Sequence, residues 1–358
     1  MTQVSPSSQT PRKTLMIRLS SLGDVILASA ALTAAERRQS PSQIHWVVSR
    51  EYASLLRGHP AIHRLWEFDR STGFLGWLKL CEKLWQEGFS EVIDLHSTLR
   101  SKLAKLYFFV RSKLASSRLA KTPMPEWRTL DKQRIRLYGY FIFRALWPED
   151  WRPGALVEKF SKVAGGDGSE RPDLSHLLRQ GASLPEDFLA FASRPYLVVM
   201  PSSRWEGKKW PVRQFLQCLL KFGMPVVVLG GREDRESQLL IKLLEQSGHP
   251  FYPGVAVFDF VQLALVIERS EGFLGNDTGL AHLAEAVGKP VTTVFGPTVP
   301  EMGFGPWRSE SRSVRSSLWC SPCGKDGRFC FRVNDRFACL QQVSADEVVK
   351  NLRAMTRV

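Results

Sequence analysis

Short apolar runs alternate with amphipathic stretches along most of the chain. In the first part, the runs that predict strands are 14–19, 43–49, 64–69 and 91–96. Helical patterns fill the intervals at 25–39, 52–57 and 76–88. Strands that alternate with helices are typical of βαβ units, which form parallel sheets with helices on their faces.

The pattern is interrupted and then starts again. Helical stretches dominate 97–144, where Pro123 and Pro125 break them, and a polar, glycine-rich stretch at 164–173 predicts a loop. Further strands are expected at 196–201, 225–231 and 290–297. Further helices are expected at 210–223, 233–248, 259–270, 278–288 and 344–355. The last helix opens with a capping box formed by Ser344 and Glu347.

This organisation predicts two α/β domains. We expect an N-terminal domain over 1–185, with a disordered tail over 1–13, and a C-terminal domain over 186–358 that contains a cysteine-rich loop at 318–340 and the final helix. Two doubly wound, Rossmann-like sheets facing each other across a cleft is the natural architecture. Ligands of such sheets bind beyond the carboxyl ends of the strands.

The composition is that of a globular protein. The 358 residues are 44% hydrophobic and 23% charged, and no apolar run is long enough to span a bilayer. The N-terminal residues lack the apolar region of a secretory signal, so we expect a cytoplasmic protein.

The chain is basic, and the excess is concentrated in one segment. The formal net charge is +14, and 98–144 contains twelve Lys or Arg residues against two acidic ones, a net charge of +10. Aromatic residues are interleaved with these charges. Such a segment attracts nucleic acid, anionic lipid headgroups or a phosphorylated acceptor, although a solvated helix face is the simpler interpretation.

The first strand leads into the loop RLSSLGDV at 18–25. Asp24 lies at a strand end and a helix start, where an aspartate acts either as a helix cap or as a general base that projects into the cleft. The loop has one glycine, Gly23, rather than the three of a dinucleotide fingerprint, so a nicotinamide-dependent oxidoreductase has little support.

A second loop, SSRWEGKKWP at 202–211, follows the first strand of the second half. Its hydroxyl residues Ser202 and Ser203 and its basic residues Lys208 and Lys209 suit a phosphate-bearing ligand, but the P-loop pattern is absent. A solvated polar loop is the alternative.

A third element, 275–297, opens a helix whose free N–H groups make an anion site. The hydroxyl of Thr278 and the amides of Gly279 and Leu280 are placed to hold a pyrophosphate, and His282 on the first turn adds a donor. Taken singly, Asp277 and Thr278 are better explained by N-capping, and His282 by burial as a satisfied imidazole. Together with the lysine loop they favour a phosphate site.

Four of the six cysteines are clustered. Cys81 and Cys218 lie in apolar helical patterns as buried thiols. The others have the spacing C-x2-C, six residues, C, eight residues, C, and are Cys320, Cys323, Cys330 and Cys339. This spacing suits a structural zinc or iron site, with disulfides or free thiols as the alternatives.

Several of these elements resemble one known family. RLSSLGDVILASAAL, VIDLHSTLRS, SRWEGKKWP, GNDTGLAHLAEAVGKPVTTVFGPT and the CSPC segment are similar to glycosyltransferase family 9, the ADP-heptose–lipopolysaccharide heptosyltransferases and their relatives. The resemblance spans nearly the whole chain. It implies the GT-B fold of two Rossmann-like domains, inversion at the anomeric carbon, and transfer without a catalytic metal.

The resemblance also implies roles for individual residues. Asp24 matches the catalytic base, and Lys208 the lysine that binds the donor phosphate. Either Glu233 or Asp234 matches the acidic residue that binds the ribose. The remaining expected donor contacts are Ser202, Ser203, Asp277, Thr278, Gly279, Leu280 and His282, and the expected acceptor contacts are Ser21, Gly23, Arg100 and Lys102.

The resemblance therefore implies an enzyme that moves heptose from ADP-heptose to the anionic inner core of lipopolysaccharide, at the inner face of the inner membrane, as a peripheral protein. Nucleic acid is not an expected partner, since no RRM, KH or zinc-finger pattern is present. The alternatives are a relative that uses another nucleotide sugar or a protein acceptor, and a non-catalytic protein that binds a nucleotide sugar or a polyanion.

Overall fold

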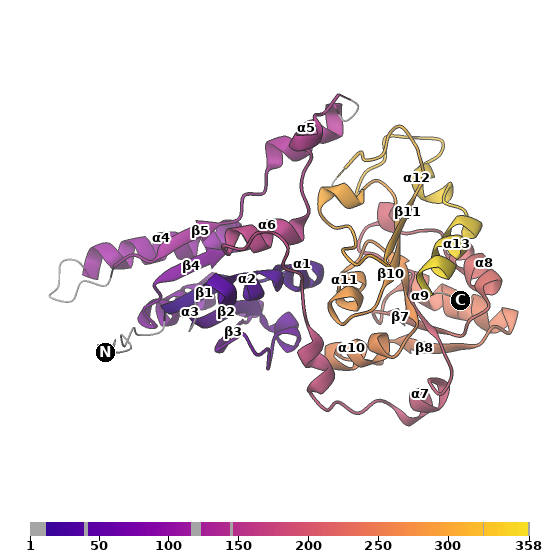
Figure 1. Cartoon of the computed structure of the whole chain (residues 1–358), viewed down its shortest axis with the longest axis horizontal. Helices are drawn as coiled ribbons and strands as arrows, with labels where there is room; N and C mark the ends of the chain where they lie inside the picture. Colours follow the sequence, from indigo (N-terminus) through magenta and orange to yellow (C-terminus); the bar gives the residue numbers. More distant parts are fainter. Residues whose placement is uncertain (1–11, 39–41, 116–122, 144–145, 325, 357–358) are drawn as a thin grey trace, which may run out of the picture.

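The computed structural model describes residues 12–38, 42–115, 123–143, 146–324 and 326–356. Two parallel β-sheets, each flanked by helices, lie side by side, the first built from the N-terminal half and the second from the C-terminal half (Figure 1). The expectation of two doubly wound α/β units is confirmed.

The first sheet has the order β3-β2-β1-β4-β5, and all its pairs are parallel. Its strands are β1 (Arg12–Ile17), β2 (Ser42–Ser49), β3 (Arg64–Phe68), β4 (Glu91–Asp94) and β5 (Glu126–Thr129). The helices of this half are α1 (Leu22–Ala28), α2 (Ala30–Arg38), α3 (Gly73–Gln86), α4 (Leu99–Ala115), α5 (Arg134–Phe143) and α6 (Leu156–Val163). Short 3₁₀ turns occupy Arg50–Leu55, Arg70–Thr72, Glu149–Trp151 and Ser175–Arg179.

The second sheet has the order β11-β10-β9-β6-β7-β8 and is also parallel throughout. Its strands are β6 (Leu197–Met200), β7 (Val226–Gly230), β8 (Phe251–Val255), β9 (Gly272–Asn276), β10 (Val291–Phe295) and β11 (Arg312–Arg315). Its helices are α7 (Glu186–Phe191), α8 (Val212–Phe222), α9 (Arg235–Ser247), α10 (Phe260–Glu268), α11 (Gly279–Ala286), α12 (Ala338–Gln341) and α13 (Ala345–Thr356), with 3₁₀ turns at Glu206–Lys208 and Pro300–Met302.

Three expectations about the first half were wrong. The first strand begins at Arg12, inside the stretch expected as a tail, because Arg12 and Lys13 already pair with β2. The helix expected over 25–39 is two helices, since the hydroxyl of Ser29 bonds the carbonyl of Ile26 and ends α1. Helix α1 also begins earlier, at Leu22, so Asp24 lies in its first turn.

The sheets lie on either side of the expected division near residue 185, but the division itself stays a prediction. Helix α6 packs against α1 and α2, and α13 packs against α8 and the second sheet. The two units meet where the start of α1 packs against α11. This contact brings the carboxyl end of β1 to face the carboxyl ends of β6 and β9.

In the described residues, no helix has the length and apolarity needed to cross a membrane.

Candidate active site

A cavity of about 440 Å³ lies where the two units meet. It opens between the loop after β1, the loop after β6 and the start of α11, as expected for parallel sheets. Its lining residues are Ser21, Leu22, Gly23, Asp24, Tyr52, Ser203, Arg204, Trp205, Lys208, Asp277, Thr278, Gly279, His282, Phe304 and Asp326. The structure therefore gathers the three sequence motifs around one space.

Asp24 enters this cavity with one of its carboxylate oxygens held in place. Its Oδ2 accepts hydrogen bonds from the backbone N–H of Ser21 at 3.2 Å and from the Ser21 hydroxyl at 2.9 Å. The same oxygen lies 2.6 Å from Nη2 of Arg18. Among the described residues, no hydrogen bond reaches Oδ1. One oxygen therefore braces the start of α1, as a helix cap does, and the other faces the cavity without a partner among the described residues.

The surroundings keep Asp24 ionised. Burial alone would raise the pKa of its carboxyl, but the positive charge of Arg18 and the bonds from Ser21 outweigh that effect, so the pKa lies below the ordinary aspartate value. The neighbouring His96 is a poor alternative base. Burial, aided by the positive charges of Arg18 and Lys132, lowers the pKa of His96 to about 3. Asp24 is thus the side chain suited to accept a proton here.

Lys208 faces Asp24 from the second unit. Its Nζ lies 2.5 Å from Oδ2 of Asp277, which also accepts a bond from the Thr298 hydroxyl at 3.1 Å. Asp277 is buried and fixed by these contacts, so it holds the ammonium group in one position. An ammonium has three donors, which leaves further donors for an anionic ligand.

The start of α11 completes the anion site. The Oγ1 of Thr278 is buried and has no hydrogen-bond partner in the structure. It precedes the free amides of the first turn of α11, so one unsatisfied hydroxyl and a helix N-terminus point to the same space. His282 is buried and stacks on Trp307, with ring centroids 5.9 Å apart. Burial lowers the pKa of His282, which keeps its ring neutral.

Two glycines allow the units to approach this closely. A Cβ atom added to Gly279 would lie 2.9 Å from the backbone nitrogen of Gly23, and one added to Gly23 would lie 3.0 Å from the ring of His282. Both positions therefore need a residue without a side chain. Gly23, expected as an acceptor contact, lines the cavity and also serves this packing.

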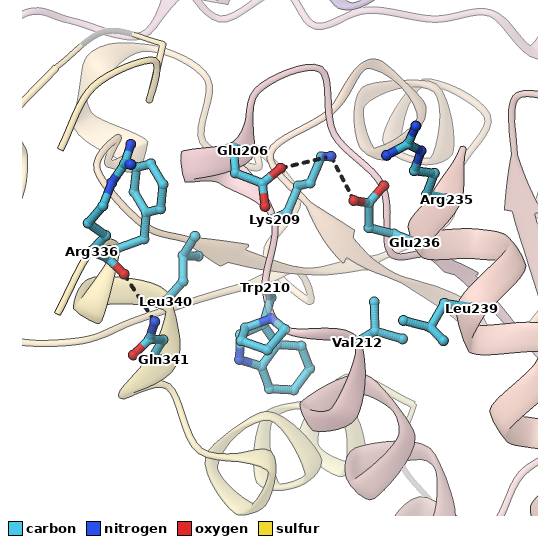
Figure 2. Close-up of a pocket in the computed structure, with 12 residues that line it drawn as sticks. Glu206, Lys209, Trp210, Val212, Arg235, Glu236, Leu239, Arg336, Leu340 and Gln341 are labelled. Atoms are coloured by element: carbon cyan, nitrogen blue, oxygen red, sulfur yellow. Dashed lines mark hydrogen bonds and ion pairs between the residues drawn. The ribbon is translucent and has the colours of Figure 1, made fainter. Parts of the chain in front are cut away.

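The two lysines of the 202–211 loop point to different places. Figure 2 shows Lys209 between Glu206 and Glu236, at 3.1 and 2.7 Å, in a second cavity formed with Trp210 and the start of α9. Lys208 alone reaches the cavity that contains Asp24. Of the two hydroxyl residues, Ser203 lines that cavity, whereas Ser202 is buried behind it.

Glu233 and Asp234 have different environments in the structure. Oδ2 of Asp234 accepts a hydrogen bond from the backbone of Gly231 at 2.6 Å and closes the turn before α9. Glu233 is exposed. Neither residue lines the central cavity. Leu280, whose amide was an expected donor contact, has a buried side chain.

The expected acceptor residues fall into three groups. Ser21 lines the central cavity beside Asp24. Lys102 lines a separate cavity of about 550 Å³ with other basic side chains, namely Lys132, Arg134 and Arg136. Arg100 is exposed and lies over the ring of Phe68, 5.8 Å from its centroid, rather than in either cavity. The charge of Asp24 acts on Lys132, so the basic cavity adjoins the central one.

The cysteine-rich loop gives no support to the expected metal site. Burial raises the pKa of the Cys339 thiol to about 12, and the nearby thiols of Cys320, Cys323 and Cys330 add to this effect. In the part of the chain that the structure describes, none of the four forms a disulfide bond. Within the described ranges, no group of three or more His, Cys, Asp or Glu side chains has an arrangement that could hold a metal ion.

The sequence motifs left several residues that line the cavity or contact Asp24 without a role. Arg18 gave a signal, since it interrupts an otherwise apolar strand where a charge must be paired if it is buried. Tyr52, in a 3₁₀ turn, and Phe304 and Asp326, in loops, gave none, because only the tertiary structure brings these segments to the cavity.

Comparison with known proteins places this arrangement in a family. The family model described as "Glycosyltransferase family 9 (heptosyltransferase)" matches residues 155–329. Lipopolysaccharide heptosyltransferase 1 of Pseudomonas aeruginosa is 27% identical over 334 residues, which cover 87% of this chain and 86% of the relative.

Two solved structures extend the comparison to the fold. A family 9 glycosyl transferase from Veillonella parvula superposes with a TM-score of 0.72 at 18% identity, covering 98% of this chain and 99% of that one. Heptosyltransferase WaaC of Escherichia coli, solved with ADP and with ADP-2-deoxy-2-fluoro heptose, superposes with a TM-score of 0.64 at 20% identity, covering 94% and 98%. The fold is thus that of the GT-B heptosyltransferases, and the chain belongs to glycosyltransferase family 9 and is a glycosyltransferase.

Proposed function

We propose that this enzyme transfers heptose from ADP-heptose to an anionic sugar of the lipopolysaccharide inner core, with inversion and with Asp24 as the general base. The observation that carries the proposal is the single cavity in which Asp24 of the first unit faces Lys208 and the start of α11 of the second. The P. aeruginosa relative is a lipopolysaccharide heptosyltransferase, and WaaC was solved with ADP.

The transfer is a single displacement. An oxygen of the acceptor forms a bond to the anomeric carbon of the donor sugar, while the bond from that carbon to the β-phosphate oxygen breaks. The acceptor hydroxyl proton passes to Oδ1 of Asp24. The contact of Arg18 with Oδ2 holds the carboxylate in position during this step. The electron pair of the broken bond stays on the diphosphate.

Lys208, the Thr278 hydroxyl and the amides at the start of α11 stabilise the charge that develops on the leaving diphosphate. Asp277 holds Lys208 in place and is neutralised by it, so it does not repel the ligand strongly. These groups are fixed before the donor binds, and preorganised donors cost little reorganisation during the reaction.

Glu233 is the residue we propose for the ribose, because Asp234 is committed to the turn. For the acceptor, we propose the basic cavity of Lys102, Lys132, Arg134 and Arg136, whose charges suit a phosphate or carboxylate of a core sugar. An acceptor of this kind is a glycolipid, which would place the enzyme at the inner face of the inner membrane as a peripheral protein.

A donor and acceptor screen tests the proposal. Purified enzyme is given ADP-heptose, or UDP-, GDP- and ADP-hexoses, with a deacylated core acceptor, and product formation is followed by mass spectrometry. We expect product from ADP-heptose and an increase of about tenfold or more in acceptor KM when Lys132 is replaced by Gln, since a charged hydrogen bond is lost. If product formed only from another nucleotide sugar, the assignment of heptose as the donor sugar would be wrong.

A further inference from the structure

Helix α5 presents a row of apolar side chains to solvent. Ile135, Tyr138 and Ile142 are 84%, 49% and 71% exposed. Their spacing of three and four residues places them on one face of the helix. Phe143 and Leu146 extend the row. The face is therefore a continuous stripe rather than a set of isolated apolar residues.

The opposite face of α5 is anchored. Tyr140 is buried in a small core with Val299 and Met302 of the second unit, and Leu137 and Phe141 pack against it. In Figure 1, α5 projects from the rest of the first unit toward the side of the molecule that carries the loops leading to α12. The exposed stripe is thus held in a fixed orientation by the second unit.

The cysteine-rich loop supplies the other half of this surface. Trp319 and Phe331 are 69% and 59% exposed, and their ring centroids lie 6.0 Å apart. Together with Phe141, Ile142, Phe143 and Leu146 they line an open, largely apolar cavity of about 500 Å³. Two segments separated by more than 170 residues in the sequence thus form one apolar surface.

Basic residues surround this apolar surface. Residues 134–152 and 318–340 each carry four Lys or Arg against two Asp or Glu. The basic cavity of Lys132, Arg134 and Arg136 also contains Ile135 of this surface. A second adjoining cavity, which shares Pro322, is lined by Arg152 and Arg315, and these pair with Glu149 and Glu301. An apolar, aromatic surface inside a positive rim has the chemistry of a protein that lies in the headgroup region of an anionic bilayer.

We propose that this apolar surface, formed by α5 with Leu146 and by Trp319 and Phe331, inserts into the interface of an anionic lipid bilayer. The inference deepens the proposed function, because a glycolipid acceptor lies in such a bilayer. The positive rim favours anionic lipid over a second copy of the chain, since a symmetric contact would bring two positive rims together.

Vesicle flotation tests the inference without the acceptor. The full chain is mixed with vesicles of phosphatidylcholine, alone or with phosphatidylglycerol. We expect binding that requires phosphatidylglycerol and falls with salt. The combined variant Ile142→Asn, Trp319→Asn and Phe331→Asn should bind about tenfold more weakly or worse, because three inserting side chains are lost.

Two controls make the result specific. The combined variant Leu189→Asn and Leu220→Asn removes apolar side chains that are 42% and 45% exposed on other helices, and it should bind vesicles like the wild type. Lipids brominated in their acyl chains should quench the fluorescence of the wild type more than that of Trp319→Phe. Thermal melting and ADP binding establish that each variant is folded.

Wild-type binding by the triple variant, or no vesicle binding by the wild type, would overturn the inference. So would a wild-type dimer that the triple variant dissolves, since a second copy would then cover the surface. Transfer to the deacylated acceptor is measured separately. If that transfer fails while the vesicle result stands, the proposed function is wrong and the membrane surface remains.

Discussion

Arg18 and Asp24, six residues apart in the sequence, form an ion pair of 2.6 Å at the edge of the central cavity. Nη1 of Arg18 also donates a hydrogen bond of 2.6 Å to the backbone carbonyl of Leu95. The end of β1, the start of α1 and the end of β4 are thus joined through one guanidinium. This contact fixes both the position and the charge of the proposed base.

Replacing Asp24 by Asn should lower turnover about 10²–10⁴-fold, the usual contribution of a general base. An amide cannot accept the acceptor proton, but it retains the shape of the side chain and one acceptor oxygen for Ser21. ADP affinity, measured by isothermal titration calorimetry, should therefore change little. A variant that retained wild-type turnover would remove Asp24 from the mechanism.

Replacing Arg18 by Met should move the acid limb of the pH profile to higher pH. Arg18 lowers the pKa of Asp24, and without it only the hydrogen bonds from Ser21 oppose the effect of burial, so that pKa rises. The base is active only when ionised, so activity should be lost at a higher pH as the solution is acidified. The measurement is kcat/KM against pH.

Arg18→Lys is the matched control for this prediction, because it keeps a positive charge and should shift the limb less. Melting temperatures establish whether either variant remains folded. If turnover fell while the acid limb stayed in place, Arg18 would act through the fold rather than through the charge of Asp24.

Lys208 and Lys209 should differ sharply in their effects on the donor. Lys208→Ala should weaken ADP binding by roughly 1.5–3 kcal/mol, the scale of a charged hydrogen bond. The loss also leaves Asp277 unpaired beside the diphosphate. Lys209→Ala is the adjacent control, since Lys209 pairs with Glu206 and Glu236 in another cavity. Equal losses in the two variants would place the diphosphate elsewhere.

Substitution of Glu233 should affect ADP binding, whereas substitution of Asp234 should affect the stability of the fold. Asp234→Ala removes the carboxylate that closes the turn before α9, and should cost about 1 kcal/mol of unfolding free energy. Glu233→Ala should leave stability within about 0.5 kcal/mol, as for most exposed positions, and weaken the affinity for ADP. Chemical denaturation and calorimetry measure the two quantities. The ribose assignment fails if Glu233→Ala binds ADP normally.

The pattern of apolar residues was enough to predict the two parallel sheets, since buried parallel strands are continuous apolar runs. β1, β4, β6, β7 and β10 were all predicted on this basis, whereas β9, which contains two glycines, was not. It also located the loops that carry Asp24, Lys208 and Thr278, because ligand loops follow such strands. What the sequence did not show were β5, β8 and β11, which lie at sheet edges. Edge strands are partly exposed, so their apolar pattern is weak.

Neighbouring residues of similar type were distinguished by their contacts in the fold. Lys208 and Lys209 are equivalent by residue type, although the family resemblance favoured Lys208, and Glu233 and Asp234 were left open. In the structure Lys208 lines the cavity and Lys209 pairs with two glutamates, while Glu233 is exposed and Asp234 closes a turn. The exposed apolar face of α5 and the aromatic residues of the cysteine-rich loop likewise form one surface only in the folded chain. The reason is physical: local patterns set which residues form an element, whereas direction and partner depend on contacts between distant segments.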